Sequence, residues 1–178
     1  MKKKLKLGII GLSEGNGHPY SWSAIFNGYD VKKMENCGFP VIPNYLKSHI
    51  FPEESISEAR VTHIWTQKKS LSKKIADTCL IENIVEDYKH MIGEVDGILL
   101  ARDDAENHYE MSKEFIKKGL PIYIDKPLAY KCEEAKKILD LQLYNGQVFT
   151  CSALAFAEEF KPNKFDLEKI GKISNIKG

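Results

Sequence analysis

A glycine-rich segment near the N-terminus has the residue types of an anion-binding turn. It reads Gly11-Leu12-Ser13-Glu14-Gly15-Asn16-Gly17-His18-Pro19 and follows the apolar stretch 4–10. Backbone amides at the start of a helix bind phosphate groups when small residues leave them uncovered. The spacing departs from the G-x-G-x-x-G pattern, since Ser13 and Asn16 stand where the second and third glycines would be. The segment predicts a phosphate site, with a turn that only reverses the chain as the alternative.

Polar residues also follow the apolar stretch 61–66 (VTHIWT). The sequence there is Thr66-Gln67-Lys68-Lys69, without the acidic residue that binds a free ribose 2′-hydroxyl in many dinucleotide sites. A hydroxyl, an amide and two ammonium groups suit a 2′-phosphate better, which favours NADP over NAD. A solvated basic loop is the alternative interpretation of two consecutive lysines.

The segment after the apolar stretch 95–101 (VDGILLA) concentrates charge. It reads Arg102-Asp103-Asp104-Ala105-Glu106-Asn107-His108. We expect one of the two aspartates to cap the following helix, and Asn107 and His108 to lie on its first turn and face a ligand. A metal site formed by the two aspartates and His108 is the less favoured interpretation, because nothing in the sequence fixes the ligand distances.

A charged pair follows the apolar stretch 121–124 and is in turn followed by a proline. The sequence is Asp125-Lys126-Pro127, and the proline biases the residue before it toward extended backbone. We expect Lys126 to point into a crevice, where its ammonium group donates to a substrate hydroxyl or to the ribose of a nicotinamide. A lysine that reaches water at the end of a strand is the alternative.

The elements that would position these residues alternate between strand and helix along the chain. Helices are expected at 19–27, 70–78 and 130–144, and between Asp104 and Gly119, and strands at 4–10, 61–66, 81–85, 95–101, 121–124 and 147–151. This alternation predicts an α/β fold, a Rossmann-like doubly wound, mainly parallel six-stranded sheet with helices on both faces. Ligands bind such sheets beyond the carboxyl ends of the strands, where all four segments above would meet.

Two regions break this alternation. Residues 30–58 hold three prolines and predict an irregular insertion with one short helix that packs on the domain or over the ligand. Residues 1–153 complete the sheet, so that 154–178 would begin a second domain, with a short helix at 166–170 and a strand at 171–178. The sequence predicts a domain boundary near residue 153.

Composition and charge exclude several classes of protein. The chain has 178 residues, with 26 Lys and Arg against 25 Asp and Glu and a net charge of +1. No basic field is available to hold nucleic acid or an anionic membrane, and no apolar run approaches the roughly 20 residues that span a bilayer. The four cysteines form no CxxC pair, which favours reduced thiols in a cytoplasmic protein over disulfides or zinc ligands.

Three segments together resemble the N-terminal domain of the Gfo/Idh/MocA family, the glucose–fructose oxidoreductase and inositol dehydrogenase group. They are residues 6–11 with the glycine turn, 95–101 followed by Asn107-His108, and 119–129 (GLPIYIDKPLA). The last is similar to the family's aG…V..EKPla segment, with Asp125 in place of Glu. Residues 170–173 (IGKI) are also similar to the iGki that begins the family's second domain.

The resemblance implies an NAD(P)-dependent oxidoreductase that transfers hydride to or from a sugar, a cyclitol or a related hydroxy compound. Lys126 would be the catalytic residue of this domain, beside Pro127. The residues expected to bind NAD or NADP are Gly11, Ser13, Gly15, Asn16 and Gly17 at the pyrophosphate, Ala101 and His108 along the nicotinamide, and Thr66, Gln67, Lys68, Arg102, Asn107, Asp125, Lys126 and Pro127.

The resemblance also bears on partners and on activity. The family's second domain supplies most substrate contacts, the usual acid–base pair of Asp and His and much of the oligomer interface. We therefore expect a small sugar-like substrate, no nucleic acid or membrane partner, a homo-oligomer and no useful turnover by the 178 residues alone. A non-catalytic module that binds a dinucleotide or another protein is the alternative function.

Overall fold

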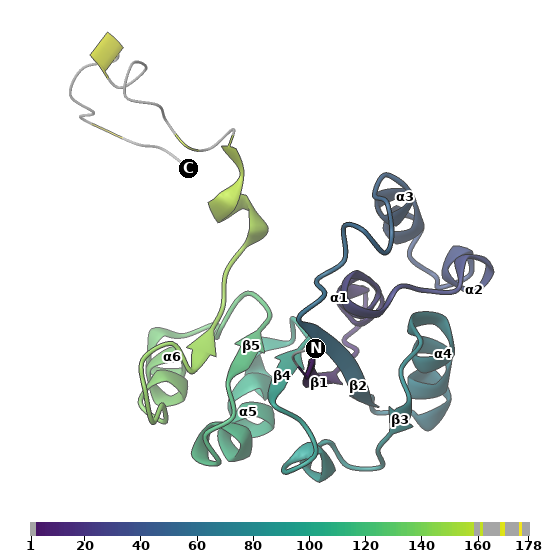
Figure 1. Cartoon of the computed structure of the whole chain (residues 1–178). Helices are drawn as coiled ribbons and strands as arrows, with labels where there is room; N and C mark the ends of the chain where they lie inside the picture. The colour runs from purple at the N-terminus through teal and green to yellow at the C-terminus, as the bar shows by residue number, and fades with distance from the viewer. Residues whose placement is uncertain (1–2, 159–160, 162–167, 170–174, 176–178) are drawn as a thin grey trace.

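The computed structural model describes residues 3–158, 161, 168–169 and 175. Within these residues a six-stranded parallel sheet has the order β3-β2-β1-β4-β5-β6 (Figure 1). The strands are β1 Leu5–Ile10, β2 Ala59–Trp65, β3 Asn83–Ile84, β4 Gly97–Leu100, β5 Ile122–Ile124 and β6 Val148–Phe149. The doubly wound fold expected from the alternation of strands and helices is confirmed.

Two hydrophobic cores lie on opposite faces of the sheet, because successive side chains of a strand point to opposite sides. Ile9 and Ile10 are both fully buried, but Ile9 belongs to the core beneath α1 and Ile10 to the core beneath α5. The first face is covered by α1 His18–Asn27 and α4 Lys69–Cys79, and the second by α5 His108–Lys117 and α6 Cys132–Leu139. Short 3₁₀ turns occupy Tyr88–Met91 (η1), Ala105–Asn107 (η2) and Ala153–Phe156 (η3).

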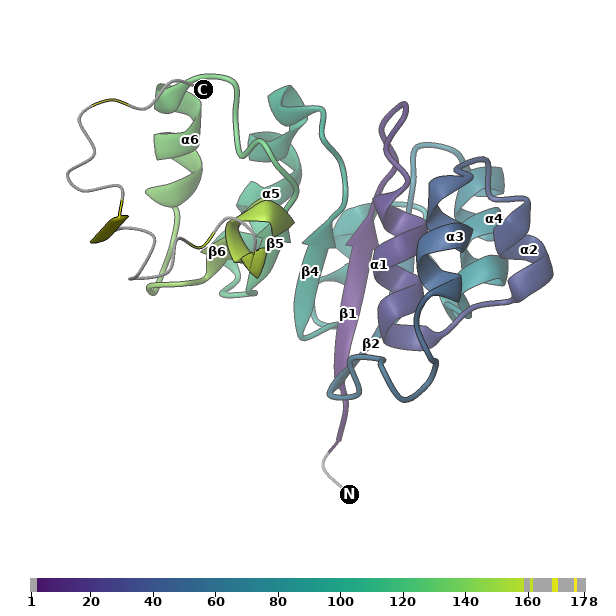
Figure 2. The ribbon, with the colours of Figure 1, turned by 90° about the horizontal axis from the view of Figure 1, so that it is seen from above.

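The insertion at 30–58 contains two short helices, α2 Val31–Glu35 and α3 Val41–Lys47, where the sequence predicts one. Asp30 starts α2, because its carboxylate accepts a hydrogen bond from the backbone N–H of Lys33 at 3.0 Å. Pro43 does not interrupt α3, since it lies in the first turn, where N–H groups have no partner within the helix. Figure 2 shows both helices packed outside α1 and α4.

Helix α6 ends at Leu139 and not at residue 144 as expected. The residues after it form a turn that two glutamine side chains hold. Gln147 is fully buried, accepts a hydrogen bond from the backbone of Leu143 at 2.7 Å and donates one to the carbonyl of Ile116 at 2.7 Å. The carbonyl oxygen of Gln142 accepts from the backbone of Val148 at 3.0 Å. These contacts replace helical hydrogen bonds and lead the chain into β6.

The insertion packs directly against the start of α1 at Gly17. A Cβ atom on Gly17 would lie 2.5 Å from Cδ1 of Ile42 and 2.8 Å from the ring of Phe39. The Phe39 ring also packs at a tilt against Tyr20, with ring centroids 6.0 Å apart. Gly17 is therefore small because the insertion approaches it, which is a packing reason independent of any ligand.

We expect Gly17→Ala to lower the free energy of unfolding by about 1–3 kcal/mol, the usual effect of overpacking. Urea denaturation of the variant measures this loss. Ile42→Ala in the same chain should recover part of it, because one of the two crowded side chains is then gone. Losses that simply add in the double variant would show that Gly17 and Ile42 do not contact each other.

Most residues of the expected second domain lie outside the described part of the chain. The predicted helix 166–170 and strand 171–178 lie outside the described residues apart from 168–169 and 175. All four cysteines are described and are free. Across the described ranges, no helix has the length and apolar character needed to cross a membrane.

Candidate functional site

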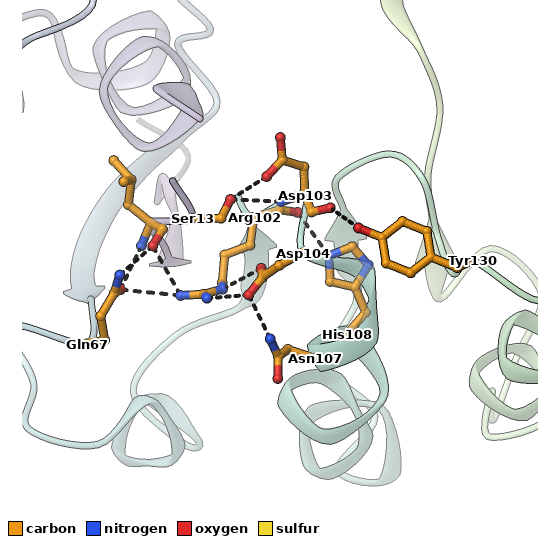
Figure 3. A network of polar contacts seen from close by, with 9 residues as sticks. Ser13, Gln67, Arg102, Asp103, Asp104, Asn107, His108 and Tyr130 are labelled. Carbon is orange, nitrogen blue, oxygen red and sulfur yellow. Dashed lines mark hydrogen bonds and ion pairs between the residues drawn. The ribbon is translucent and has the colours of Figure 1, made fainter. Parts of the chain in front are cut away.

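The segments that follow β1, β2 and β4 meet at the carboxyl edge of the sheet and are joined by polar contacts (Figure 3). Gln67, after β2, holds the turn after β1 through both ends of its amide. Its Oε1 accepts from the backbone N–H of Leu12 at 3.2 Å, and its Nε2 donates to the carbonyl oxygen of Leu12 at 2.7 Å. The same Oε1 accepts from Arg102, after β4, at 3.3 Å. This edge is the place where the sequence predicts ligand binding.

Arg102 is 8% exposed and connects this network to the start of α5. Its guanidinium donates to the carbonyl oxygen of Leu12 at 3.2 Å and forms a bidentate ion pair with Asp104. The carboxylate of Asp104 also accepts a hydrogen bond from Nδ2 of Asn107 at 2.7 Å. Burial alone would raise the pKa of Asp104, but the hydrogen bonds from Arg102 and Asn107 outweigh it and lower that pKa. Asp104 precedes η2, but its side chain makes no capping hydrogen bond there. The carboxylate of Asp104 is paired with Arg102 and that of Asp103 with Ser13, so the prediction that one of the two aspartates caps the following helix is wrong.

Asp103 lies against the glycine-rich turn. Its carboxylate accepts a hydrogen bond from the hydroxyl of Ser13, and its backbone N–H donates to that hydroxyl at 3.1 Å. Its carbonyl oxygen accepts from Tyr130 at 3.4 Å. The second position of the glycine pattern therefore carries a side chain that is tied to a negative charge.

His108 is fully buried, at 0% exposure. Its Nε2 lies 2.9 Å from the carbonyl oxygen of Arg102 and its Nδ1 lies 3.1 Å from that of Leu128. Both ring nitrogens thus contact backbone oxygens that connect the segments after β4 and β5. The ring has no free nitrogen for a ligand or a metal, and the described residues contain no cluster of three His, Cys, Asp or Glu side chains suited to a metal ion.

The segment after β5 contacts the start of α1. Asp125 is 1% exposed, and its Oδ2 lies 2.8 Å from Nδ2 of Asn16 and 2.5 Å from Nδ1 of His18. Burial alone would raise the pKa of Asp125, but the hydrogen bonds from His18 and Asn16 outweigh it and lower that pKa. Asp125 is therefore a buried carboxylate held in its charged form by two side chains of the glycine-rich segment.

A pocket of about 560 Å³ opens beside this cluster, between α1 and the insertion. We call it the α1 pocket. Its wall includes His18, Ser21 and Trp22 of α1, Tyr45 of α3, Asp103 and Lys126. Apolar side chains, Ile25, Phe39 and Ile42 among them, complete the wall, and a mostly apolar lining with a few polar groups is typical of small-molecule pockets.

The structure brings most of the predicted residues to this edge but leaves only some of them accessible. Gly15, Gln67, Lys68, Lys126 and Pro127 are exposed, and Asn107 is half-buried. The buried ones are Gly11, Ser13, Asn16, Gly17, Thr66, Ala101, Arg102, His108 and Asp125. Their contact with a cofactor stays a prediction, and for Thr66 and His108 the side chains already bond within the protein.

Sequence reasoning gave no role to His18 or Trp22. The signal for His18 was its place directly after the glycines, but its partner Asp125 is 107 residues away. Trp22 lies in the helix expected at 19–27, and it stacks on the imidazole of His18, with ring centroids 4.8 Å apart and an interplanar angle of 11°. Neither contact can be derived from local sequence.

The residues at this edge fit a dinucleotide. Gly15 has φ +77°, and a Cβ built on it would meet no heavy atom within 4 Å, so its backbone is open to a ligand. Exposed cations, Lys68 and Lys126, stand after β2 and β5 on either side of this turn. The carboxylate of Asp103, which accepts a hydrogen bond from the Ser13 hydroxyl, would repel a phosphate at that position. The donor set as a whole suits an anionic ligand along the edge.

Comparison with known proteins agrees with the topology. Residues 42–152 match the model of an oxidoreductase family described by its NAD-binding Rossmann fold. This range starts after the glycine-rich turn. No curated protein matches the chain in sequence.

Solved structures show the same fold at low identity. The myo-inositol 2-dehydrogenase of Lactobacillus plantarum is 15% identical with a TM-score of 0.59, covering 88% of this chain and 38% of its own. A Gfo/Idh/MocA family oxidoreductase of Vibrio cholerae is 14% identical with a TM-score of 0.56, at 83% and 38% coverage. A levoglucosan dehydrogenase in complex with NADH is 20% identical with a TM-score of 0.52, at 78% and 32%. The chain thus spans less than two-fifths of the length of these structures.

Proposed function

Because the chain belongs to the Gfo/Idh/MocA oxidoreductase family with an NAD-binding Rossmann fold, we propose that its carboxyl edge binds NAD or NADP. The proposed reaction is hydride transfer between this dinucleotide and a sugar, a cyclitol or a related hydroxy compound. The observation that carries it is the open turn at Gly15 beside a pocket lined by polar, aromatic and aliphatic side chains, with Lys126 among them. Turnover is proposed for a protein in which this domain works together with a substrate-binding domain.

The chain's own residues would divide the binding between them. The backbone around Gly15 would take the pyrophosphate, and the ammonium of Lys68 would lie near the adenosine ribose. The ammonium of Lys126 would donate to the nicotinamide ribose or to a substrate hydroxyl. The dinucleotide, when bound, accepts or gives the hydride.

Titration of the intrinsic fluorescence with NADH and with NADPH tests binding. The chain has two tryptophans, and Trp22 lies in the wall of the α1 pocket. We expect saturable quenching by at least one of the two dinucleotides. No response to either one, with binding also absent by calorimetry, would contradict the proposed function.

Lys68→Ala should weaken NADPH binding about tenfold and leave NADH binding almost unchanged, because only NADPH carries the 2′-phosphate that a charge-assisted hydrogen bond would hold. Calorimetric dissociation constants for both dinucleotides measure this difference. Lys117→Ala is the matched control, since Lys117 is an exposed lysine at the far end of α5. Equal weakening of both dinucleotides would show that Lys68 does not read the 2′ position.

Asp103→Asn should tighten dinucleotide binding about fivefold. The substitution removes one negative charge beside Ser13, which changes the interaction energy with a nearby phosphate by about 1 kcal/mol. Asn can still accept the hydrogen bond from the Ser13 hydroxyl, so the turn should keep its shape. Asp140→Asn, an exposed change at the end of α6, is the control, and unchanged affinity in Asp103→Asn would place the phosphates away from Ser13.

A second candidate is a module that binds no dinucleotide and acts through protein contacts. The observation that favours it is the Ser13–Asp103 hydrogen bond, which places a carboxylate against the turn. The titrations above distinguish the two functions, because this module would bind neither NADH nor NADPH, even with the Asp103→Asn substitution.

A further inference from the structure

We propose that His18 is a proton-transfer residue of this domain, which exchanges a proton with a hydroxyl group of a ligand in the α1 pocket while Asp125 holds its ring. The proposal deepens the proposed function and rests on it. It adds an acid–base group that the domain itself supplies, next to Lys126.

The hydrogen bonds of Asp125 fix which nitrogen of His18 carries the proton. A charged carboxylate can only accept hydrogen bonds, so Nδ1 of His18, at 2.5 Å from Oδ2, is the donor. In the neutral ring the other nitrogen, Nε2, is then an acceptor with a free lone pair. Within the described part of the chain, Nε2 has no hydrogen-bond partner.

The two side chains of the His18–Asp125 pair differ in their exposure to solvent. The side chain of Asp125 is 2% exposed, whereas that of His18 is 35% exposed and forms part of the pocket wall. A buried carboxylate that orients an accessible imidazole through Nδ1 is the arrangement in which histidine serves as a general base.

Two further contacts hold the imidazole in place. Trp22 stacks on it at a centroid distance of 4.8 Å. Asn16 accepts a hydrogen bond from the backbone N–H of His18 at 2.8 Å through Oδ1 and donates to Asp125 through Nδ2. The ring is therefore fixed on one face, at one nitrogen and at its backbone, which is the pre-organisation that proton transfer requires.

His108 shows what a structural histidine looks like in the same molecule. It is fully buried, and each of its nitrogens contacts a backbone oxygen. His18 differs in both respects, since it is partly accessible and has one nitrogen without a partner in the described ranges. The accessible nitrogen is what allows His18, and not His108, to exchange a proton with a ligand.

The proton transfer balances in charge. The O–H bond of the ligand breaks with its electron pair left on oxygen, and the proton forms a new N–H bond at Nε2. The alkoxide then lies in the pocket that Lys126 also lines, and the imidazolium lies against the carboxylate of Asp125. The hydride acceptor that oxidation of the carbon also requires is the nicotinamide dinucleotide of the proposed function.

The first test is the tautomer of His18 in the 178-residue chain, read from the ¹⁵N shifts of its imidazole. We expect a protonated Nδ1 and an unprotonated Nε2, together with modification of His18 by diethyl pyrocarbonate, located by mass spectrometry. His108 is the internal control and should stay unmodified in the folded chain. A proton on Nε2 of the neutral ring, or a His18 that resists modification, would overturn the proposal whether or not a dinucleotide binds.

The second test is turnover with a panel of cyclitols and sugars in a protein that carries the whole site. His18→Ala should lower the rate about 10²-fold or more, change the dissociation constant of NADH less than twofold, and be partly rescued by added imidazole. Near-normal turnover, or a loss that imidazole does not restore although NADH still binds, would contradict the role of His18. Absence of both NADH and NADPH binding by the unaltered chain would instead contradict the proposed function, leaving the tautomer test to decide on His18.

Discussion

Replacing Lys126 by Met is expected to lower turnover about 10²-fold or more and to leave the fold intact. The ammonium of Lys126 has no ion pair or side-chain hydrogen bond with the rest of the described chain, and the residue is exposed at the pocket. Methionine keeps the apolar stem, so the free energy of unfolding should change by less than about 0.5 kcal/mol. A loss of this size is expected because the substitution removes a positioned charge or proton donor from the site.

Initial rates of dinucleotide reduction, in a protein that carries the whole site, measure this effect, with circular dichroism and urea denaturation on the same variant. Lys131→Met is the control, because Lys131 is an exposed lysine that starts α6. Normal turnover in Lys126→Met would leave the lysine as a side chain that only reaches water at the end of β5.

Replacing Asp125 by Ala is expected to lower the free energy of unfolding by about 3 kcal/mol. Its carboxylate is the acceptor for Asn16 Nδ2, for Nδ1 of His18 and for the backbone N–H of Lys126. Two of these donors belong to buried or partly buried side chains that would lose a charged partner, at about 1.5–3 kcal/mol for each such hydrogen bond before the structure relaxes. The change should exceed that of almost any surface substitution.

The difference in the free energy of unfolding between the unaltered protein and Asp125→Ala should become smaller at acidic pH. The pKa of Asp125 is lowered in the folded protein from a reference of 3.8, so its carboxylate contributes fully above pH 3.8. That contribution falls as the pH drops through the lower folded-state pKa, where the carboxyl group becomes protonated. The gap between the two proteins should therefore be constant near neutral pH and narrow below about pH 3.8.

Urea denaturation of both proteins at several pH values measures the gap. Asp96→Ala is the control, because Asp96 accepts one backbone hydrogen bond, from Lys6 at 2.7 Å, at an exposed position. A loss no larger than that of the control would mean that the cluster around Asp125 does not stabilise the fold.

The sheet could be predicted because its signals are local. Stretches such as 95–101 are apolar over the length of a strand, and Gly28 and Gly119 interrupt the helical pattern at the points where α1 and α5 end. The prediction was wrong at the end of α6, where contacts with side chains far away in the sequence determine the structure. The end of α6 depends on Gln147 and its bond to Ile116, 31 residues away.

The candidate site divides in the same way. The edge of the sheet and the segments that reach it follow from topology, since the carboxyl ends of parallel strands share one edge. The pairs Ser13–Asp103 and His18–Asp125 join residues 90 and 107 positions apart. No periodicity links such residues, and the sequence could show only that each of them follows a strand.

The side-chain amide of Gln67 adds one more hydrogen-bonded pair to the edge of the sheet. It offers Leu12 one acceptor and one donor, as a neighbouring strand would, although the pairing of β1 with β2 ends at Ile10 and Trp65. The start of the turn that we propose to bind the dinucleotide is therefore held in place without a ligand. Association then loses little conformational entropy in this part of the turn, so the enthalpy and entropy of binding should report the contacts of the ligand and not the folding of its cradle.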